Sequence, residues 1–264
     1  MNITFAIAAA ELVVIVLLVL LSLRLRQRYE TVRLKFSTPM PSILPRDFDP
    51  RFRENALGCT LDAEVTLVGC GSGSFGSTSD TEAWVLGALA KGCGQVFEFG
   101  TATGRTTYIL ARNIGPEGKV STLTLASEEI ATYQEGTSDS GGAKFNALRE
   151  SRYGGFLYAG TGVEPRIEQL FGDSKHFDES RFAGQCDLIF IDGSHAYSYI
   201  KSDSEKALRM LRPGGVVLWH DYRGRHVRPA RDVFRYLNEL SKTLPLVHLR
   251  GTSLVAHRAP ARPA

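Results

Sequence analysis

The stretch VFEFGTATGRTT, residues 96–107, decides the fold of this chain. A short apolar run carries Glu98 and leads into a loop of small residues between Gly100 and Gly104, after which a helix is expected to open at Arg105. Glycines let the backbone approach a ligand closely, and a helix start offers free N–H groups and the positive end of the helix dipole. The stretch therefore predicts a strand, a glycine loop and a helix that together cradle a nucleotide-like ligand.

The residues around this cradle alternate between strand and helix patterns. The run Asp187–Ile191 is apolar throughout, which suits a parallel strand buried on both faces. The predicted class is α/β, a doubly wound, Rossmann-like, mostly parallel sheet with a C-terminal antiparallel hairpin. Strands are expected at 96–99, 119–125, 166–171, 187–191 and 216–219, helices at 81–90, 106–112, 143–151, 199–211 and 230–240, and the hairpin at 246–249 and 253–256.

Ligands of such sheets bind at the carboxyl ends of the strands, near the point where the strand order reverses. Several polar or glycine residues of this chain fall at predicted strand ends, and their convergence is a stronger signal than any single motif. They are Glu98, Gly100, Asp173, Asp192, His220 and Asp221.

The N-terminal residues Ile3–Leu23 form an apolar run that only Thr4, Glu11 and Ser22 interrupt. As a helix the run would extend roughly 31 Å, enough to cross a bilayer core. Basic residues follow the run and none precedes it, so the positive-inside rule puts the remainder of the chain in the cytoplasm. The sequence thus predicts a single-pass membrane protein with one N-terminal transmembrane helix and a cytoplasmic catalytic domain. A buried or amphipathic helix is the alternative.

Composition and charge place the rest of the chain among ordinary globular domains. The 264 residues are 43% hydrophobic and 22% charged, and the formal net charge is +3, so the chain as a whole does not resemble a polyanion binder. We expect a membrane anchor with a basic flank at 1–35, a proline-rich linker and lead-in at 36–76, the main domain at 77–257 and a disordered tail at 258–264.

A second glycine cluster precedes the main stretch and imitates a dinucleotide fingerprint. Gly71, Gly73 and Gly76 satisfy G-x-G-x-x-G, and Glu98 follows about twenty residues later. The true motif places its last glycine inside a helix, whereas here the helix-capping residues 77–80 follow. We therefore interpret the cluster as a flexible loop, and a nicotinamide-dependent oxidoreductase that uses Gly71–Gly76 is an alternative function.

Three motifs in order make the domain recognisable: VFEFGTATGRTT at 96–107, QLFGDS at 169–174 and CDLIFIDGSHAYSYIKSDSEKALRMLRPGGVVLWHDY at 186–222. Together they resemble the class I S-adenosylmethionine-dependent methyltransferases, particularly the small-molecule O-methyltransferases of the catechol type and their bacterial relatives. The resemblance covers roughly residues 77–257. It implies S-adenosylmethionine as cofactor and methyl transfer, here to an oxygen of a small-molecule, glycan or lipid-linked acceptor at the cytoplasmic membrane face.

The resemblance also assigns the cofactor-binding residues. The loop from Gly100 through Thr101 to Gly104 would lie under the methionine part, and Glu98 would anchor this loop or the cofactor's amino group. By the same resemblance, the residues beside the adenine and beside the sulfonium are Asp173, Ser174 and Asp192.

One position departs from the family pattern. The family usually ends its second strand with an acidic residue that binds both ribose hydroxyls, but the matching residue here is Thr124. Either Glu128 or Glu129 reaches back to the ribose, or Thr124 makes a weaker contact. A membrane-tethered binding module that has lost turnover is therefore a further alternative.

The catalytic residues that the resemblance implies are Asp192 and His195. In catechol-type relatives a basic residue at the position of His195 serves as general base, and an ordinary histidine pKa of about 6.5 suits this role. In metal-dependent relatives the ligands would match Asp192, His220 and Asp221. Magnesium prefers oxygen ligands, so the histidine leaves a divalent cation such as magnesium open. Alternatively, Asp192 belongs to a strand-exit turn and His220 is a hydrogen-bonded histidine at the sheet edge.

Basic residues crowd the loop after Asp221: Arg223, Arg225, His226, Arg228 and Arg231. This loop is either a solvated surface or a site for an acidic acceptor or anionic lipid headgroups. No nucleic-acid module or interleaved aromatic residues accompany it, so we expect no nucleic-acid partner.

Overall fold

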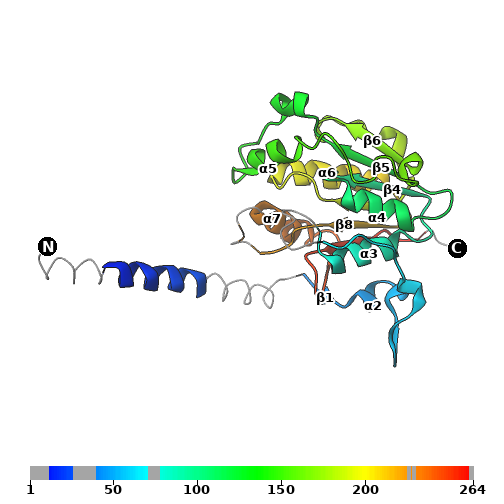
Figure 1. Cartoon of the computed structure of the whole chain (residues 1–264), viewed down its shortest axis with the longest axis horizontal. Helices are drawn as coiled ribbons and strands as arrows, with labels where there is room; N and C mark the ends of the chain where they lie inside the picture. The colour runs from blue at the N-terminus through cyan, green and yellow to red at the C-terminus, as the bar shows by residue number, and fades with distance from the viewer. Residues whose placement is uncertain (1–11, 26–39, 71–77, 225–226, 228–229, 262–264) are drawn as a thin grey trace, which may run out of the picture.

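The computed structural model describes residues 12–25, 40–70, 78–224, 227 and 230–261. Within these residues the centre is an eight-stranded mixed sheet in the order β1-β9-β10-β8-β7-β4-β5-β6 (Figure 1). Strands β8, β7, β4, β5 and β6 are mutually parallel, whereas β10 runs antiparallel to both β8 and β9. The strands are β1 (Ser42–Ile43), β4 (Gln95–Phe99), β5 (Lys119–Thr124), β6 (Ile167–Phe171), β7 (Cys186–Ile191), β8 (Leu211–Trp219), β9 (Val247–Leu249) and β10 (Val255–Arg258).

Helices cover both faces of this sheet. Side chains alternate along a strand, so Val96 of β4 packs in the core beneath α3 (Asp80–Ala90) and α4 (Arg105–Asn113). Its neighbour Phe97 packs in the opposite core with α6 (Tyr197–Met210) and α7 (Arg231–Leu240). The chain enters β4 at the centre, builds β5 and β6 on one side and then returns to β7 on the other. The order of the strands therefore reverses between β4 and β7, as the sequence predicts for a doubly wound sheet.

Two segments depart from the structure that their residue patterns suggest. Strand β8 begins at Leu211 and passes through Arg212-Pro-Gly-Gly215. These helix- and strand-breaking residues coincide with an irregularity in the pairing with β7 and do not form a loop. The strand-like alternation at 63–68 forms no strand. Thr66 is instead held by Asn113 of α4, whose side chain accepts from the Thr66 N–H at 2.8 Å and donates to its carbonyl at 2.7 Å.

The segment predicted as linker and lead-in lies against the domain over its described residues. β1 pairs with β9, and short elements follow it. Arg51 donates to the carbonyls of Ala88 and Leu89 at the C-terminus of α3, and Asp49 holds both Arg51 and Arg258 of β10. The short elements are α2 (Pro45–Phe48), η1 (Pro50–Phe52), β2 (Glu54–Asn55), β3 (Gly58–Cys59) and η2 (Leu61–Ala63).

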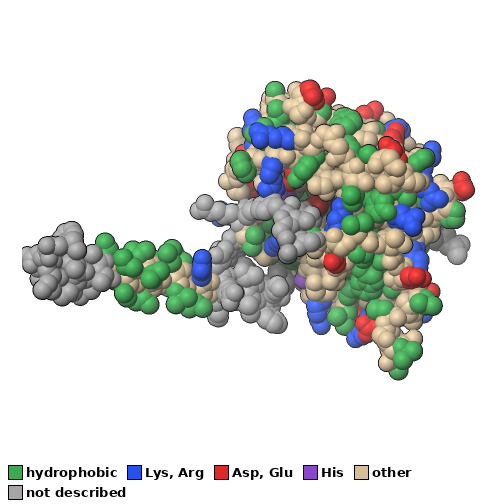
Figure 2. All heavy atoms as spheres, in the orientation of Figure 1, with side chains coloured by type: hydrophobic (Ala, Val, Ile, Leu, Met, Phe, Trp, Pro, Cys, Tyr) green, Lys and Arg blue, Asp and Glu red, His purple; other side chains and the backbone are tan. Residues whose placement is uncertain are grey.

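The transmembrane helix predicted over Ile3–Leu23 is contradicted. Residues 12–25 are helical and their large hydrophobic side chains are exposed (Figure 2), but in the part of the chain that is described no helix combines the length and the apolar character that a bilayer span requires. Residues 3–11 of that run lie outside the described residues, as do residues 262–264 of the predicted disordered tail. The prediction rested on hydropathy counted over the whole run.

Candidate active site

Gly100 follows β4 where the strand order reverses, between the ends of β5 and β7. Its N–H donates to the carbonyl of Leu123 at 2.8 Å, and the Asp192 N–H donates to the carbonyl of Phe99 at 2.8 Å. The φ of Gly100 is +99°, and a Cβ there would overlap the backbone carbonyl of Asp192. Only glycine fits this approach, and it brings Asp192 beside the loop, as the sequence predicts for strand ends.

The rest of the glycine loop is fixed by a close contact at Gly104 and by hydrogen bonds to side chains of β5 and β6. Gly104 caps α4 with a φ of +76°, and a Cβ there would lie 2.9 Å from the ring of Tyr158. Thr101 is buried and its hydroxyl bonds that of Thr122 at 2.8 Å, while the amide of Gln169 donates to Thr101 at 3.2 Å. The loop is therefore rigidly placed over β5 and β6.

Glu98 lies beneath the loop and is fully buried. Its Oε2 accepts from the hydroxyl of Thr107 in α4 at 2.5 Å and from that of Thr122 in β5 at 2.7 Å, and its Oε1 is buried without a partner. Burial raises the pKa of Glu98 to about 8, so the carboxyl is mostly protonated at neutral pH. These bonds join α4 to β5, and the two roles that the resemblance implies for Glu98 stay predictions.

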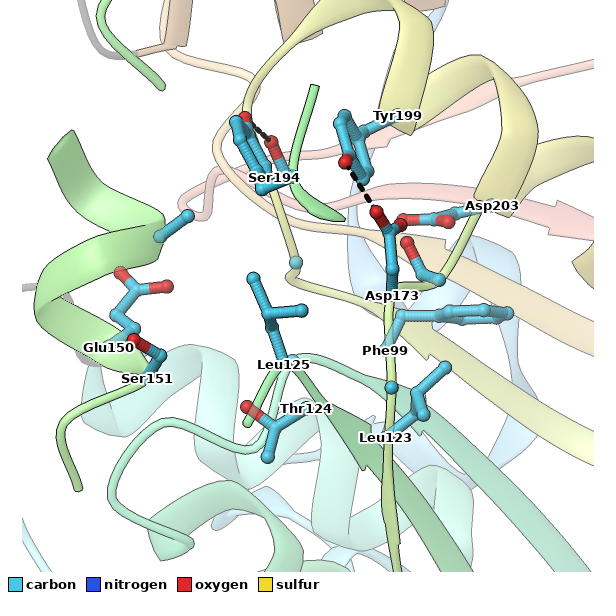
Figure 3. A pocket seen from close by; sticks show the side chains of 16 residues that line it. Phe99, Leu123, Thr124, Leu125, Glu150, Ser151, Asp173, Ser194, Tyr199 and Asp203 are labelled. Atoms are coloured by element: carbon cyan, nitrogen blue, oxygen red, sulfur yellow. Dashed lines mark hydrogen bonds between the residues drawn. The ribbon is translucent and has the colours of Figure 1, made fainter. Parts of the chain in front are cut away.

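A cleft runs along the strand ends above the loop, and we call it the strand-end cleft. Its first cavity extends over β5 and β6 toward α6 (Figure 3), and its second lies over residues 100–106. Gly100 and Glu150 line both cavities. Among the predicted site residues, the cleft is lined by Gly100, Thr101, Thr124, Asp173, Ser174 and Asp192.

The far end of the cleft is built by Asp173, Tyr199 and Asp203. Tyr199 of α6 donates to Asp173 at 2.8 Å, as Figure 3 shows. Asp203 is one helical turn from Tyr199, and its buried Oδ1 has no partner. Burial raises the pKa of Asp203 to about 7. Sequence reasoning missed both α6 residues, although their i, i+4 spacing could have placed them on one helix face.

The near end holds Asp192, His195, His220 and Asp221, which we call the acid–histidine cluster. His195 Nε2 lies 2.8 Å from the carboxylate of Asp221, whose φ of +62° is unusual for a residue with a side chain. His220 Nδ1 donates to Asp192 at 2.8 Å, and its Nε2 lies 3.3 Å from Glu82 of α3. The cluster thus joins the ends of β7 and β8 to α3.

The carboxylates of this cluster raise the pKa of both histidines. Burial alone would lower the pKa of His220, but Asp192 and Glu82 raise it well above 6.5. Burial also opposes the charge on His195, and its hydrogen bond with Asp221 outweighs burial and raises the pKa. Conversely, the two histidines bring the pKa of Asp221 well below its usual range despite burial.

The metal group differs from the predicted one. Ligand atoms of Asp192, His195 and Asp221 lie within 4.8 Å of one another, so His195 takes the place expected for His220. Both ring nitrogens of His220 face carboxylates instead, Glu82 and Asp192. The buried Nδ1 of His195 has no partner, and two carboxylates with one imidazole are a donor set that fits a divalent cation.

Glu82 is a site residue that the sequence analysis missed. Its carboxylate accepts from Ser79 in a capping box that begins α3, from both the N–H and the hydroxyl of Ser253, and from His220. The Ser79-x-x-Glu82 spacing predicts the cap. It does not predict the hydrogen bond to His220, which is 138 residues away in the sequence.

The structure describes some of the remaining predicted residues, and the others lie outside the described ranges. Thr124 ends β5 and lines the cleft, and Arg223 pairs with Asp221 at 2.6 Å. Gly71–Gly76 lie outside the described residues, as do Arg225, His226 and Arg228. The flanks of that glycine cluster are held by Arg105, which donates to the carbonyls of Val68 and Thr78 at 2.8 Å each.

Comparison with known families and structures bears on this geometry. Residues 97–222 match the model of a family described as a methyltransferase domain. A search of curated proteins finds no match.

Solved structures similar to the chain include three methyltransferases. One is the O-methyltransferase TomG from Streptomyces achromogenes in complex with S-adenosylmethionine, with 20% identity, coverage of 69% of this chain and 82% of the other, and a TM-score of 0.47. Another is the Podospora anserina methyltransferase PaMTH1 bound to S-adenosylhomocysteine, with 16% identity, 70% and 80% coverage and a TM-score of 0.49. The third is a Bacillus cereus O-methyltransferase in complex with S-adenosylhomocysteine, with 19% identity, 69% and 81% coverage and a TM-score of 0.44.

The family match begins in β4, just before the glycine loop, and ends with Tyr222, just after the acid–histidine cluster. It confirms the predicted resemblance to methyltransferases. Residues 97–222 of this chain are therefore a methyltransferase domain.

Proposed function

We propose that this domain is an S-adenosylmethionine-dependent O-methyltransferase acting on a small-molecule acceptor. The observation that carries the proposal is the course of the strand-end cleft, which runs from Asp173 past the glycine loop to Asp192, beside which His195 pairs with Asp221 at 2.8 Å. The two adjoining cavities thus offer a place for a long cofactor, and His195 offers a proton acceptor beside Asp192 at one end.

The residues fit S-adenosylmethionine by charge and by space. When bound, the cofactor supplies a methyl group on a sulfonium, which a nucleophile can remove to leave a neutral thioether. Asp192 lies where a carboxylate would attract that positive centre, and the loop at Gly100–Gly104 with the start of α4 offers N–H groups for the cofactor's carboxylate. Asp173 and the unpartnered Oδ1 of Asp203 can accept hydrogen bonds from an adenine amine at the far end.

His195 is the proposed general base. Its imidazole would take the proton of an acceptor hydroxyl as the oxygen forms its bond to the methyl carbon, and Asp221 would stabilise the resulting imidazolium. The hydrogen bond with Asp221 raises the pKa of His195, so its basic form becomes available at a higher pH than that of an ordinary histidine. Arg223, which pairs with Asp221 at 2.6 Å, favours an acceptor with negative charge.

A divalent cation on Asp192, His195 and Asp221 is a second chemical option, supported by the close approach of their ligand atoms. These residues would hold the ion, and it would supply a positive charge to stabilise an acceptor oxyanion. His195 could not then act as the base, because its lone pair would be used. Activity that survives a chelator, with no change on adding magnesium, would reject this option.

Calorimetric titration with S-adenosylmethionine, S-adenosylhomocysteine and NAD tests the proposal. We expect both sulfur compounds to bind and NAD not to bind. Binding of NAD alone would overturn the proposal in favour of an oxidoreductase. Tight binding of S-adenosylhomocysteine without methyl incorporation into any of a panel of phenols, catechols, carboxylates and glycans would instead favour a binding module.

A further inference from the structure

The end of β5 is where this chain departs from its family, and the structure shows which carboxylates lie near it. Thr124 lines the cleft at this point. Glu128 is exposed and bonds its neighbour Ser127, and Glu129 faces Gly172 at the end of β6. Neither glutamate is among the residues that line the two cavities. The predicted reach of one of them back to the cleft is therefore not seen.

A different glutamate lies in the cleft. Glu150 is the last residue of α5 (Ala143–Glu150), and Figure 3 shows its side chain pointing into the cavity on the side of Thr124, across from Asp173 and Asp203. Helix α5 is held in place because Ala143 and Ala147 pack against the stacked rings of Tyr133 and Tyr199.

The place of Glu150 along the cleft matches the middle of a bound cofactor. If the methionine part lies over the glycine loop and the adenine lies at Asp173, the ribose must lie where the two cavities meet. Gly100 and Glu150 are the two residues that line both cavities. Gly100 offers no side chain, so Glu150 is the side chain at this junction.

Glu150 is also free to accept hydrogen bonds. The other cleft carboxylates are engaged or face another end: Asp173 accepts from Tyr199, Asp192 accepts from His220, and Asp203 lies at the far end. Arg149 lies 3.8 Å from Glu150 between their charged atoms, and His195 also acts on the charge of Glu150. Two hydroxyl donors on neighbouring ribose carbons suit a carboxylate with this free capacity.

We propose that Glu150 recognises the ribose hydroxyls of the cofactor, so that helix α5 supplies the carboxylate that the end of β5 lacks. This inference rests on the proposed function, since it presumes an S-adenosyl cofactor in the cleft. Burial raises the pKa of Glu150 to about 7, and hydroxyl donors would draw it toward the ionised form.

Calorimetry on the full chain tests this assignment with S-adenosylhomocysteine and its 2′,3′-dideoxy analogue. Glu150→Gln should weaken the binding of S-adenosylhomocysteine roughly 10-fold or more, because hydrogen bonds to a charged acceptor are lost. The same variant should change the binding of the dideoxy analogue by less than about 2-fold, because no hydroxyl remains to be recognised. Glu129→Gln is the matched control and should leave both affinities unchanged. Circular dichroism melting checks that each variant is folded.

Each other outcome has a definite meaning. No binding of S-adenosylhomocysteine by the unaltered chain would overturn the proposed function itself. Normal binding by Glu150→Gln, with or without a loss of turnover, would overturn the ribose assignment alone. An equal loss for both ligands would also overturn it, because the effect would then be structural. A dideoxy-sensitive loss in Glu129→Gln would move the role to Glu129.

Discussion

The strand ends on the two sides of the strand-end cleft differ in the charge of their side chains. At the ends of β7 and β8 the charged groups satisfy one another: His220 lies between Asp192 and Glu82, and His195 pairs with Asp221. At the end of β5 the cleft is lined by neutral side chains, Leu123, Thr124 and Leu125. The ends of β7 and β8 thus present paired charges, whereas the end of β5 itself presents two apolar side chains and a single hydroxyl.

The difference separates chemistry from binding. Buried charges persist only where partners compensate their lost hydration, so the acid–histidine cluster gathers titratable groups that proton transfer can use. A neutral wall needs no such partners and contributes affinity through burial and a few hydrogen bonds. Substitutions in the cluster should therefore act on turnover, and those at the β5 end on cofactor affinity.

The largest effect is expected for His195→Ala. Loss of the proposed base should lower kcat by roughly 10²- to 10⁴-fold, while the Kd for S-adenosylhomocysteine changes by less than about 3-fold. Steady-state kinetics and calorimetry measure the two effects. Adding Asp221→Asn to this variant should lower kcat little further, because the pair acts as a unit. Unchanged turnover in His195→Ala would remove His195 from the chemistry.

Gly100 lies between the two sides, so Gly100→Ala should impair both turnover and cofactor binding. The added Cβ would meet the Asp192 carbonyl in a left-handed backbone conformation, at a cost of about 4 kcal/mol in unfolding free energy. Gly160→Ala is the control, since Gly160 has a φ of +72° but open space around it, and should cost only about 1 kcal/mol. Urea denaturation measures both. Equal costs would mean that Gly100 is constrained by its backbone angle alone.

Glu82→Gln should destabilise the cluster by about 3 kcal/mol, because a buried ion pair loses one partner. The pKa of Glu82 is lowered by His220 and Ser253 despite burial, so its contribution is present above its ordinary pKa of 4.5 and is lost as the pH falls.

The pKa of His220 is raised, so its contribution is present below 6.5 and is lost only as the pH rises through its higher folded value. The stability difference between the unaltered chain and Glu82→Gln should therefore be greatest near pH 5–6. Urea unfolding between pH 4 and pH 9 measures it, and a pH-independent difference would contradict a charged His220.

The smallest effect is expected for Thr124→Ala at the neutral end. Loss of one hydroxyl contact should weaken S-adenosylhomocysteine binding by about 1 kcal/mol, close to 5-fold, and leave kcat at saturating cofactor unchanged. Thr243→Ala, in an exposed turn away from the cleft, is the control and should bind normally. A fall in kcat with normal binding would break the division between the two sides.

The sequence by itself determined the sheet and the place of the site. Apolar runs of strand length, helical periodicity and the glycine loop are local signals, and the polar residues after each run had to gather at one edge because parallel strands end together. A count of hydropathy along Ile3–Leu23 was equally local, but it predicted a membrane span that the described helices do not contain.

Only the tertiary structure decided which groups carry charge and which remain free. His195 and His220 both follow strand ends, but packing surrounds His220 with Asp192 and Glu82 and leaves the Nδ1 of His195 unpartnered. Glu150 reaches the cleft from a helix whose sequence shows no sign of a ligand. Such roles depend on contacts between residues distant in the chain, and on burial, which no local pattern encodes.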